Sequence, residues 1–220
     1  MDLIGYLIEV QVDISAGLPA WDIVGLPDTS VRESKERVRT AIKNSYFEFP
    51  SRKILVNLAP ANTKKEGSLF DLPIAVGILI STEIISNANI ENTIFIGELS
   101  LNGKLNKVKG ILPMCIEAAK LGMKNVILPA ENAKEAAIVK NINVIPVKDL
   151  KQVVNYLNKV EEINYEKIDI ERLFENNQNY DIDFSEVKGQ ENIKRALEIS
   201  AAGGHNCLLI GSPRLTEKQC

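Results

Sequence analysis

Residues 99–105 read Leu-Ser-Leu-Asn-Gly-Lys-Leu, two short apolar runs joined at Asn102-Gly103. An Asn-Gly pair between apolar residues is the strongest short signal for a β-hairpin, because both residues tolerate a positive φ in a tight turn. A strand pattern over 93–96 precedes this hairpin. After it come helix patterns over 112–121, 133–139 and 150–157, and strand patterns over 126–128 and 144–147. Helices that alternate with strands in this way are typical of an α/β sheet.

The N-terminal part of the chain carries two further strand patterns. Residues 6–14 alternate between apolar and polar side chains, except at Leu7, and therefore predict a strand with one buried face. A turn over 15–19 separates this strand from a shorter one over 20–24. The two strands are expected to pair as a hairpin.

An amphipathic helix, capped by Thr29 or Asp28, is predicted to run to about Ser45, with apolar side chains on one face. Its charged face includes the basic residues Arg32, Lys35, Arg37, Arg39 and Lys43. Acidic residues lie between these cations and no aromatic residue does. A solvated helix face is therefore a better interpretation than a nucleic-acid surface.

A strand over 53–59 and an apolar helix over 72–80 come next, joined by a polar loop. Pro73 has no N–H to donate to an earlier carbonyl and fits the first turn of that helix. Asp71 is therefore the expected N-cap, and Ser68 is left in the loop.

Composition places the chain among ordinary folded proteins. Hydrophobic residues make up 45% and charged residues 25%, and the net charge of −3 does not indicate nucleic-acid binding. Three cysteines without Cys-x-x-Cys spacing and a single histidine, His205, exclude a Cys/His zinc cluster and favour the reducing cytoplasm. The N-terminus has no secretory pattern, and the longest apolar run, 72–80, is far shorter than the roughly 20 residues that span a membrane. No membrane partner is expected.

A shift to polar composition marks a linker at about 158–182. The predicted organisation is a first domain over 1–157, the linker, and the start of a second domain over 183–220.

The second domain begins with a helix pattern over 192–202, after which come glycines and the apolar run Cys-Leu-Leu-Ile at 207–210. A buried strand that ends in a glycine is how a phosphate-binding loop is presented, so Gly211, Ser212 and Pro213 are the predicted nucleotide-binding residues. The positions that should carry Gly, Lys and Ser/Thr instead hold Thr216, Glu217 and Lys218. An acidic side chain facing phosphates is repulsive, so the loop is incomplete.

This lead-in resembles the magnesium-chelatase-like AAA+ ATPases of the YifB and ComM type, whose matching segment continues as Gly-Ser-Pro-Gly-Ser-Gly-Lys-Thr-Met. The match ends at Pro213. With suitable codons a one-base slip converts Gly-Lys-Thr-Met into Thr-Glu-Lys-Gln-Cys, and we interpret the tail as frameshifted. Further motif blocks of the same family lie at 13–19, 22–29, 32–39 and 57–73.

Residues 97–105, 110–111 and 118–132 resemble the Lon protease domain, whose α+β fold also occurs in the second domain of ribosomal protein S5. Lon chemistry needs a serine at a helix start and a lysine held neutral by burial. The resemblance puts Leu69 and Leu112 at those positions, so no catalytic residue is expected. A register shift that uses Ser68, with Lys107 or Lys109 as the base, is the less favoured alternative. In the favoured interpretation Ser68 is a loop or capping residue and both lysines are exposed.

The resemblance thus implies a Lon-like domain without its dyad, and after it the first strand-helix unit of a P-loop AAA+ domain. In the intact ComM type it implies a hexameric, ATP- and Mg²⁺-dependent DNA helicase that promotes branch migration. Most of the catalytic residues of such a motor would lie beyond Cys220, so this chain is expected not to hydrolyse ATP and to bind no metal. A stand-alone non-catalytic binding or assembly module is the alternative, and a serine peptidase is the less favoured one.

Overall fold

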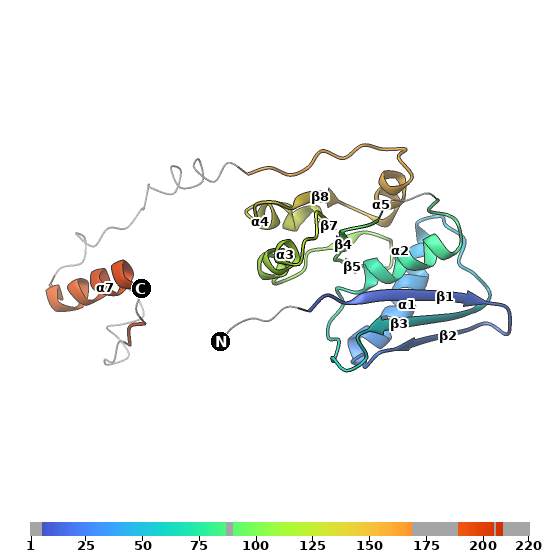
Figure 1. Cartoon of the computed structure of the whole chain (residues 1–220), viewed down its shortest axis with the longest axis horizontal. Coiled ribbons are helices and arrows are strands. Elements are labelled where there is room, and N and C mark those ends of the chain that lie inside the picture. The colour runs from blue at the N-terminus through green and yellow to red at the C-terminus, as the bar shows by residue number, and fades with distance from the viewer. Residues whose placement is uncertain (1–5, 87–89, 169–188, 205, 209–220) are drawn as a thin grey trace. The chain divides into compact units, whose positions relative to one another are not determined.

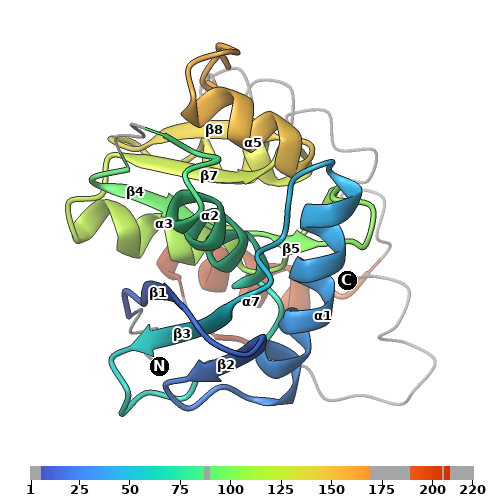
Figure 2. The ribbon, with the colours of Figure 1, turned by 90° about the vertical axis from the view of Figure 1, so that its right-hand side faces the viewer.

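The computed structural model describes residues 6–86, 90–168, 189–204 and 206–208 (Figure 1). The chain divides into two units, Met1–Ile168 and Asp169–Cys220. The first unit holds two three-stranded sheets and a two-stranded hairpin. Figure 2 shows the two larger sheets at opposite ends of this unit, with helix α2 (Asp71–Ser81) between them.

The first sheet has the strand order β1-β3-β2. Its strands are β1 (Glu9–Ser15), β2 (Ala20–Val24) and β3 (Lys53–Ala59). β1 runs antiparallel and β2 parallel to β3, so Val12 and Ile23 both lie opposite Val56. The predicted hairpin between the first two strands is therefore wrong. The central place of β3 agrees with its burial. Ile54, Val56 and Leu58 are all fully buried, whereas the alternate residues of β1 are only half-buried.

The second sheet contains only parallel strands, in the order β4-β7-β8. Its strands are β4 (Thr93–Phe95), β7 (Asn125–Pro129) and β8 (Asn143–Val147). The helices along this part of the chain are α3 (Ile111–Lys120), the short 3₁₀ helix η1 (Ala130–Asn132), α4 (Ala133–Ala136) and α5 (Leu150–Leu157). The predicted alternation of strands and helices is confirmed, although the helix predicted over 133–139 is shorter than expected.

The central strand β7 separates two apolar clusters. Val126 and Leu128 pack with residues of α3 and α4, whereas Ile127 belongs to the larger cluster that includes α1 (Thr29–Asn44), α2 and α5. Successive side chains of a strand point to opposite faces, which places α3 and α4 on one face of the second sheet and α2 and α5 on the other. A parallel sheet covered on both faces is the arrangement that such sheets require.

Helix α1 (Thr29–Asn44) begins as predicted, because Asp28 caps it by accepting a 2.7 Å hydrogen bond from the Val31 N–H. The prediction for α2 is right about Pro73, which lies in the first turn, and wrong about the cap. Phe70 occupies the N-cap position of α2 without a side-chain hydrogen bond, and Asp71 is fully buried in the first turn. Its carboxylate binds Arg37 instead.

Three of the cations on the charged face of α1 make specific contacts, which the solvated-face interpretation missed. Arg37 pairs with Asp71, and Lys35 donates to the Trp21 carbonyl and lies 3.7 Å from the Asp22 carboxylate. The Arg39 guanidinium stacks 5.8 Å from the Trp21 ring centre and 5.2 Å from that of Phe49. These cations hold α1 against β2 and α2.

The hairpin predicted at Asn102-Gly103 is confirmed. β5 (Glu98–Leu99) pairs with β6 (Leu105–Asn106), and the Ser100 N–H donates to the Lys104 carbonyl across the turn. The Asn102 side-chain oxygen accepts from the Lys104 N–H at 3.1 Å, which closes the turn locally.

The first unit continues beyond residue 157, where the sequence places the start of a linker. The Asn158 side-chain amide donates to the Ile84 carbonyl and accepts from the Ser86 N–H, and the Glu166 N–H donates to the carbonyl of Val144 in β8. These contacts hold residues 158–168 on the first unit.

In the second unit, helix α7 (Glu191–Gly203) forms as predicted over 192–202, and none of its residues is buried. Cys207 and Leu208 are exposed and lie outside any strand, contrary to the buried strand predicted for them. A buried strand needs neighbouring strands, and the described residues of this unit supply only α7. No helix among the residues described in either unit is long and apolar enough to cross a membrane.

Candidate functional site

The two positions at which a Lon-type dyad is expected carry leucines at the starts of two helices. Leu69 lies just before α2 and packs against both apolar clusters. Leu112 lies in the first turn of α3, where its side chain is half-buried and its N–H donates to the Glu135 carboxylate at 3.1 Å. A hydrocarbon side chain is neither a nucleophile nor a base, so Leu69 and Leu112 cannot serve as a serine–lysine dyad.

Ser68, the alternative nucleophile, is bound to a carboxylate and not to a lysine. Its hydroxyl donates to Glu98, whose other oxygen accepts a 2.9 Å hydrogen bond from the Asn106 amide. The hydrogen bond from Ser68 and the one from Asn106 hold the pKa of Glu98 below its ordinary value, so Glu98 is a poor base. Lys107 and Lys109 are exposed, as predicted, and neither donates a hydrogen bond to Ser68 within the described residues.

A buried ion pair fixes the helix start beside these positions. The Arg37 Nε and Nη2 groups donate to the two Asp71 carboxylate oxygens at 2.7 and 3.0 Å, and the Leu99 N–H donates to the same carboxylate at 3.2 Å. Burial raises the pKa of Asp71 despite these three bonds, while the bond to Asp71 raises the pKa of Arg37. The pair joins α1, α2 and β5, and we assign it a structural role.

The loop that leads into α3 is fixed by a buried side chain that hydrogen-bonds to its main chain. Asn132 is fully buried, and its side chain accepts from the Val108 N–H at 3.0 Å and donates to the Val108 carbonyl at 2.8 Å. The side chains of Ser68, Asp71 and Asn132 therefore all have hydrogen-bond partners. This pattern is typical of a scaffold and not of a reaction centre.

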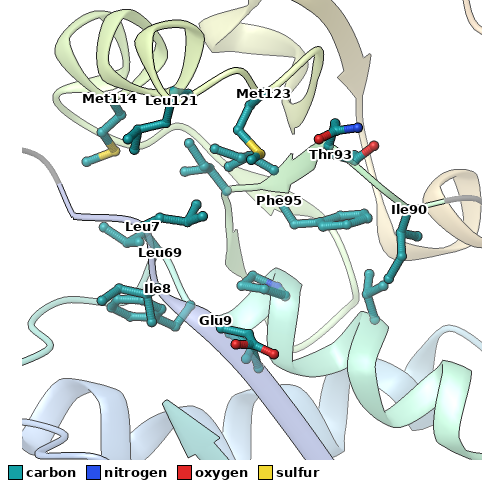
Figure 3. Close-up of a pocket in the computed structure, with 18 of the residues that line it drawn as sticks. Leu7, Ile8, Glu9, Leu69, Ile90, Thr93, Phe95, Met114, Leu121 and Met123 are labelled. Carbon is teal, nitrogen blue, oxygen red and sulfur yellow. The ribbon is translucent and has the colours of Figure 1, made fainter. Parts of the chain in front are cut away.

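An apolar pocket of about 480 Å³ adjoins Leu69 (Figure 3). Its walls come from the start of β1, from α2, from β4 and from α3, and most of its lining side chains are aliphatic, aromatic or methionine. The labelled apolar side chains in Figure 3 are Leu7, Ile8, Leu69, Ile90, Phe95, Met114, Leu121 and Met123. The charged residues of the lining are Glu9 and Glu117. Pockets of roughly 300–1,000 Å³ with such walls are the usual form of ligand sites.

Sequence reasoning did not predict this pocket, although one signal pointed to it. Leu7 breaks the alternation of the first strand, and it is 47% exposed in the structure. Leu121, at the end of α3, is 49% exposed. Both leucines line the pocket. Only Leu7, an apolar side chain at a position expected to be polar, indicated the pocket in the sequence.

The predicted nucleotide-binding residues Gly211, Ser212 and Pro213 lie outside the residues that the structure describes. Among the described residues, no three His, Cys, Asp or Glu side chains are grouped so that they could hold a metal ion.

Comparison with known proteins places these features in one family. Residues 10–132 match the family model for subunit ChlI of Mg-chelatase, and residues 183–216 match that for magnesium chelatase, subunit ChlI. The chain is 38% identical over 211 residues to the competence protein ComM of Haemophilus influenzae, which covers 94% of this chain and 41% of the relative. It is 42% identical over 209 residues to the uncharacterized protein YifB of Salmonella typhimurium, covering 94% of this chain and 40% of the relative. Lon protease 2 of Bacillus subtilis is 28% identical over 171 residues, 69% of this chain and 30% of its own length.

Proposed function

Since the chain belongs to the YifB/ComM family of magnesium-chelatase-like proteins, we propose that it is the front part of an ATP-driven motor whose first unit binds a partner without cutting it. The observation that carries the binding role is the pair Leu69 and Leu112 at the dyad positions, with an apolar pocket beside Leu69. Hydrocarbon side chains remove the reaction and supply a surface that excludes water. The likeness to Lon protease 2 therefore extends to fold and not to activity.

The motor role is supported by the match of residues 183–216 to the magnesium chelatase model and by the likeness to ComM. The chain spans 41% of the length of ComM and 40% of that of YifB, so these activities are proposed for the intact protein. We propose ATP hydrolysis with Mg²⁺, assembly as a hexamer, and action on DNA as a helicase in branch migration, in the cytoplasm. Gly211, Ser212 and Pro213 are the proposed nucleotide-loop residues of this chain.

For the chain of 220 residues we propose that ATP is not hydrolysed, because Glu217 stands where the phosphate-binding lysine belongs. Titration with a fluorescent ATP analogue tests this point. No saturable signal is expected up to about 100 μM nucleotide, since the loop lacks its cation. Saturation at micromolar nucleotide would refute the proposal that the loop has lost its nucleotide site.

A stand-alone binding module is the second candidate, favoured by the compact first unit that packs through residue 168 with its own core. The two candidates predict different coding sequences after the codons for Cys-Leu-Leu-Ile-Gly-Ser-Pro at 207–213. Sequencing the gene from the codon for Ile210 onward, in all three frames, separates them. A shifted frame that reads Gly-Lys-Thr-Met and continues as a chelatase-type ATPase supports the motor, and its absence supports the module.

A further inference from the structure

We infer that the pocket accepts an extended, apolar segment of another polypeptide, which lies as an added strand between β1 and β4 and pairs with the main chain of Phe95. This inference rests on the binding role proposed for the first unit and names the chemical class of its partner. It is carried by the main-chain groups that face the pocket, by the side chains of its walls and by the charge at its rim.

Along the outer edge of β4, the described residues leave the donor and acceptor of Phe95 unbonded. The next outward-facing residue, Gly97, is bonded within the chain, because its N–H donates to the Leu69 carbonyl at 3.1 Å and its carbonyl accepts from the Leu72 N–H at 3.0 Å. The Ile96 N–H donates to the Ile127 carbonyl of β7 at 3.0 Å. Main-chain groups of successive residues in a strand point to alternate sides, so the N–H and C=O of Phe95 face away from β7. Thr93 faces the same way, and its N–H already donates to the Ile90 carbonyl at 3.1 Å. Among the described residues, no hydrogen bond outside the sheets involves the main chain of Phe95.

A second strand edge borders the same pocket. The Val12 carbonyl lies 3.5 Å from the Ser81 hydroxyl, so it points away from β3, with which β1 pairs. By the same alternation the main chain of Val10, which lines the pocket, also faces away from β3. An extended peptide carries main-chain donors and acceptors along both of its edges, unlike a compact apolar ligand. It is therefore the class of occupant that suits a pocket between two open strand edges.

The side chains of the walls define what such a segment carries. Its central residues must be apolar, because the walls are formed mainly by aliphatic side chains together with Phe95 and two methionines. The charges of the lining, Glu9 and Glu117, are both negative, and Glu117 also lies 3.2 Å from Lys120. Charge complementarity thus favours a lysine or arginine at an end of the segment and disfavours acidic peptides and nucleic acid.

The first test uses a fluorescein-labelled probe peptide, Lys-Val-Ile-Val-Thr-Val-Lys, titrated with the full chain and monitored by fluorescence anisotropy. Saturable binding is expected. The control peptide has the same side chains but carries N-methyl groups on alternate residues along one edge, which removes donors without removing apolar surface. Methylation of the edge that pairs with β4 is expected to weaken binding at least tenfold.

Two matched variants locate the site. Leu121→Glu places a charge at the pocket wall, and Leu101→Glu places one at the hairpin, where Leu101 does not line the pocket. Both leucines are exposed, 49% and 55%, so neither change disturbs a core. Leu121→Glu is expected to weaken binding at least tenfold, and Leu101→Glu less than twofold. Glu9→Lys, also at an exposed residue, is expected to weaken the basic probe severalfold through repulsion.

Three results would overturn the inference: no saturable binding, equal binding of every methylated peptide and the parent peptide, or full binding by Leu121→Glu. Mass spectrometry of the recovered probe distinguishes failure of this inference from failure of the proposed function. A probe that binds and is cleaved contradicts the non-catalytic role but not strand addition. A probe that neither binds nor is cleaved contradicts strand addition and leaves the non-catalytic role standing.

Discussion

Removing Arg37 tests whether the buried pair with Asp71 holds the first unit together. Arg37→Ala deletes two hydrogen bonds to the Asp71 carboxylate, of 2.7 and 3.0 Å, and one of 3.0 Å to the Ser30 carbonyl. It leaves a fully buried carboxylate with only the 3.2 Å bond from the Leu99 N–H. Breaking a buried pair costs about 3–5 kcal/mol. Because the Arg37 side chain is 22% exposed, we expect the low end of that range, about 3 kcal/mol.

The loss of folding stability caused by Arg37→Ala should depend on pH in a defined direction. Burial already raises the pKa of Asp71 in the folded chain, and removal of Arg37 raises it further because the bonds that lower it are gone. A carboxyl whose folded pKa exceeds its unfolded value stabilises the fold most below the unfolded pKa, and that contribution is lost as the pH rises through the folded pKa. The destabilisation caused by Arg37→Ala should therefore be larger at pH 8 than at pH 5.

Urea unfolding monitored by Trp21 fluorescence measures the effect. Trp21 is the only tryptophan and is 8% exposed in the core of the first unit, so its signal reports on that unit. Arg32→Ala, at an exposed residue of the same helix, is the control and should cost less than about 0.5 kcal/mol. Adding Asp71→Asn to Arg37→Ala removes the buried charge but keeps an acceptor for the Leu99 N–H. This double variant should recover about 1–2 kcal/mol and lose the added pH dependence. A cost below about 1 kcal/mol for Arg37→Ala, or a double variant no more stable than the single one, would refute the reasoning.

Three further outcomes are expected, for a cysteine, a glycine and a main-chain amide. Cys115 is buried, and its pKa is raised to about 11 by burial and by the charge of Glu135, so iodoacetamide at pH 8 should modify the exposed Cys207 and spare Cys115. Equal modification of both cysteines by mass spectrometry would contradict this burial. A Cβ at Gly25, whose φ is +101°, would lie 2.2 Å from the Leu58 carbonyl oxygen, so Gly25→Ala should cost about 2 kcal/mol or more in urea unfolding. Gly17→Ala should cost less, because a Cβ there meets no atom within 4 Å, and equal costs would contradict the close approach at Gly25. In hydrogen exchange by NMR, the Phe95 amide should exchange faster than the Ile96 amide, which is bonded to Ile127, and slow protection of Phe95 in the free chain would show that the β4 edge is already paired.

Local sequence patterns predicted the elements better than their pairing. The strand over 53–59 and the helix over 150–157 were found with the bounds that the structure gives, because each is a short periodic run between clear boundaries. The order β1-β3-β2 was missed, since the turn over 15–19 is compatible with a hairpin and no local feature shows that a later strand lies between the two.

The role of Asp71 was missed for a similar reason. An acid just before an apolar helix is a good N-cap in isolation, but its partner Arg37 lies 34 residues earlier in the chain. The pocket likewise depends on bringing β1, α2, β4 and α3 together, and only the unexpected leucine at position 7 recorded it locally. The assignment of Leu69 and Leu112 to the dyad positions rests on the motifs around them in the sequence and stays a prediction.

The central claim is that the first unit binds without cutting, and labelling with a fluorescent fluorophosphonate tests it most directly. The full chain is treated under conditions that label a known serine peptidase to completion, with Ser68→Ala treated in parallel. We predict no labelling of either chain, because Leu69 replaces the nucleophile and the hydroxyl of Ser68 is bound to Glu98 without a base. Labelling of the parent chain that disappears in Ser68→Ala would contradict the account.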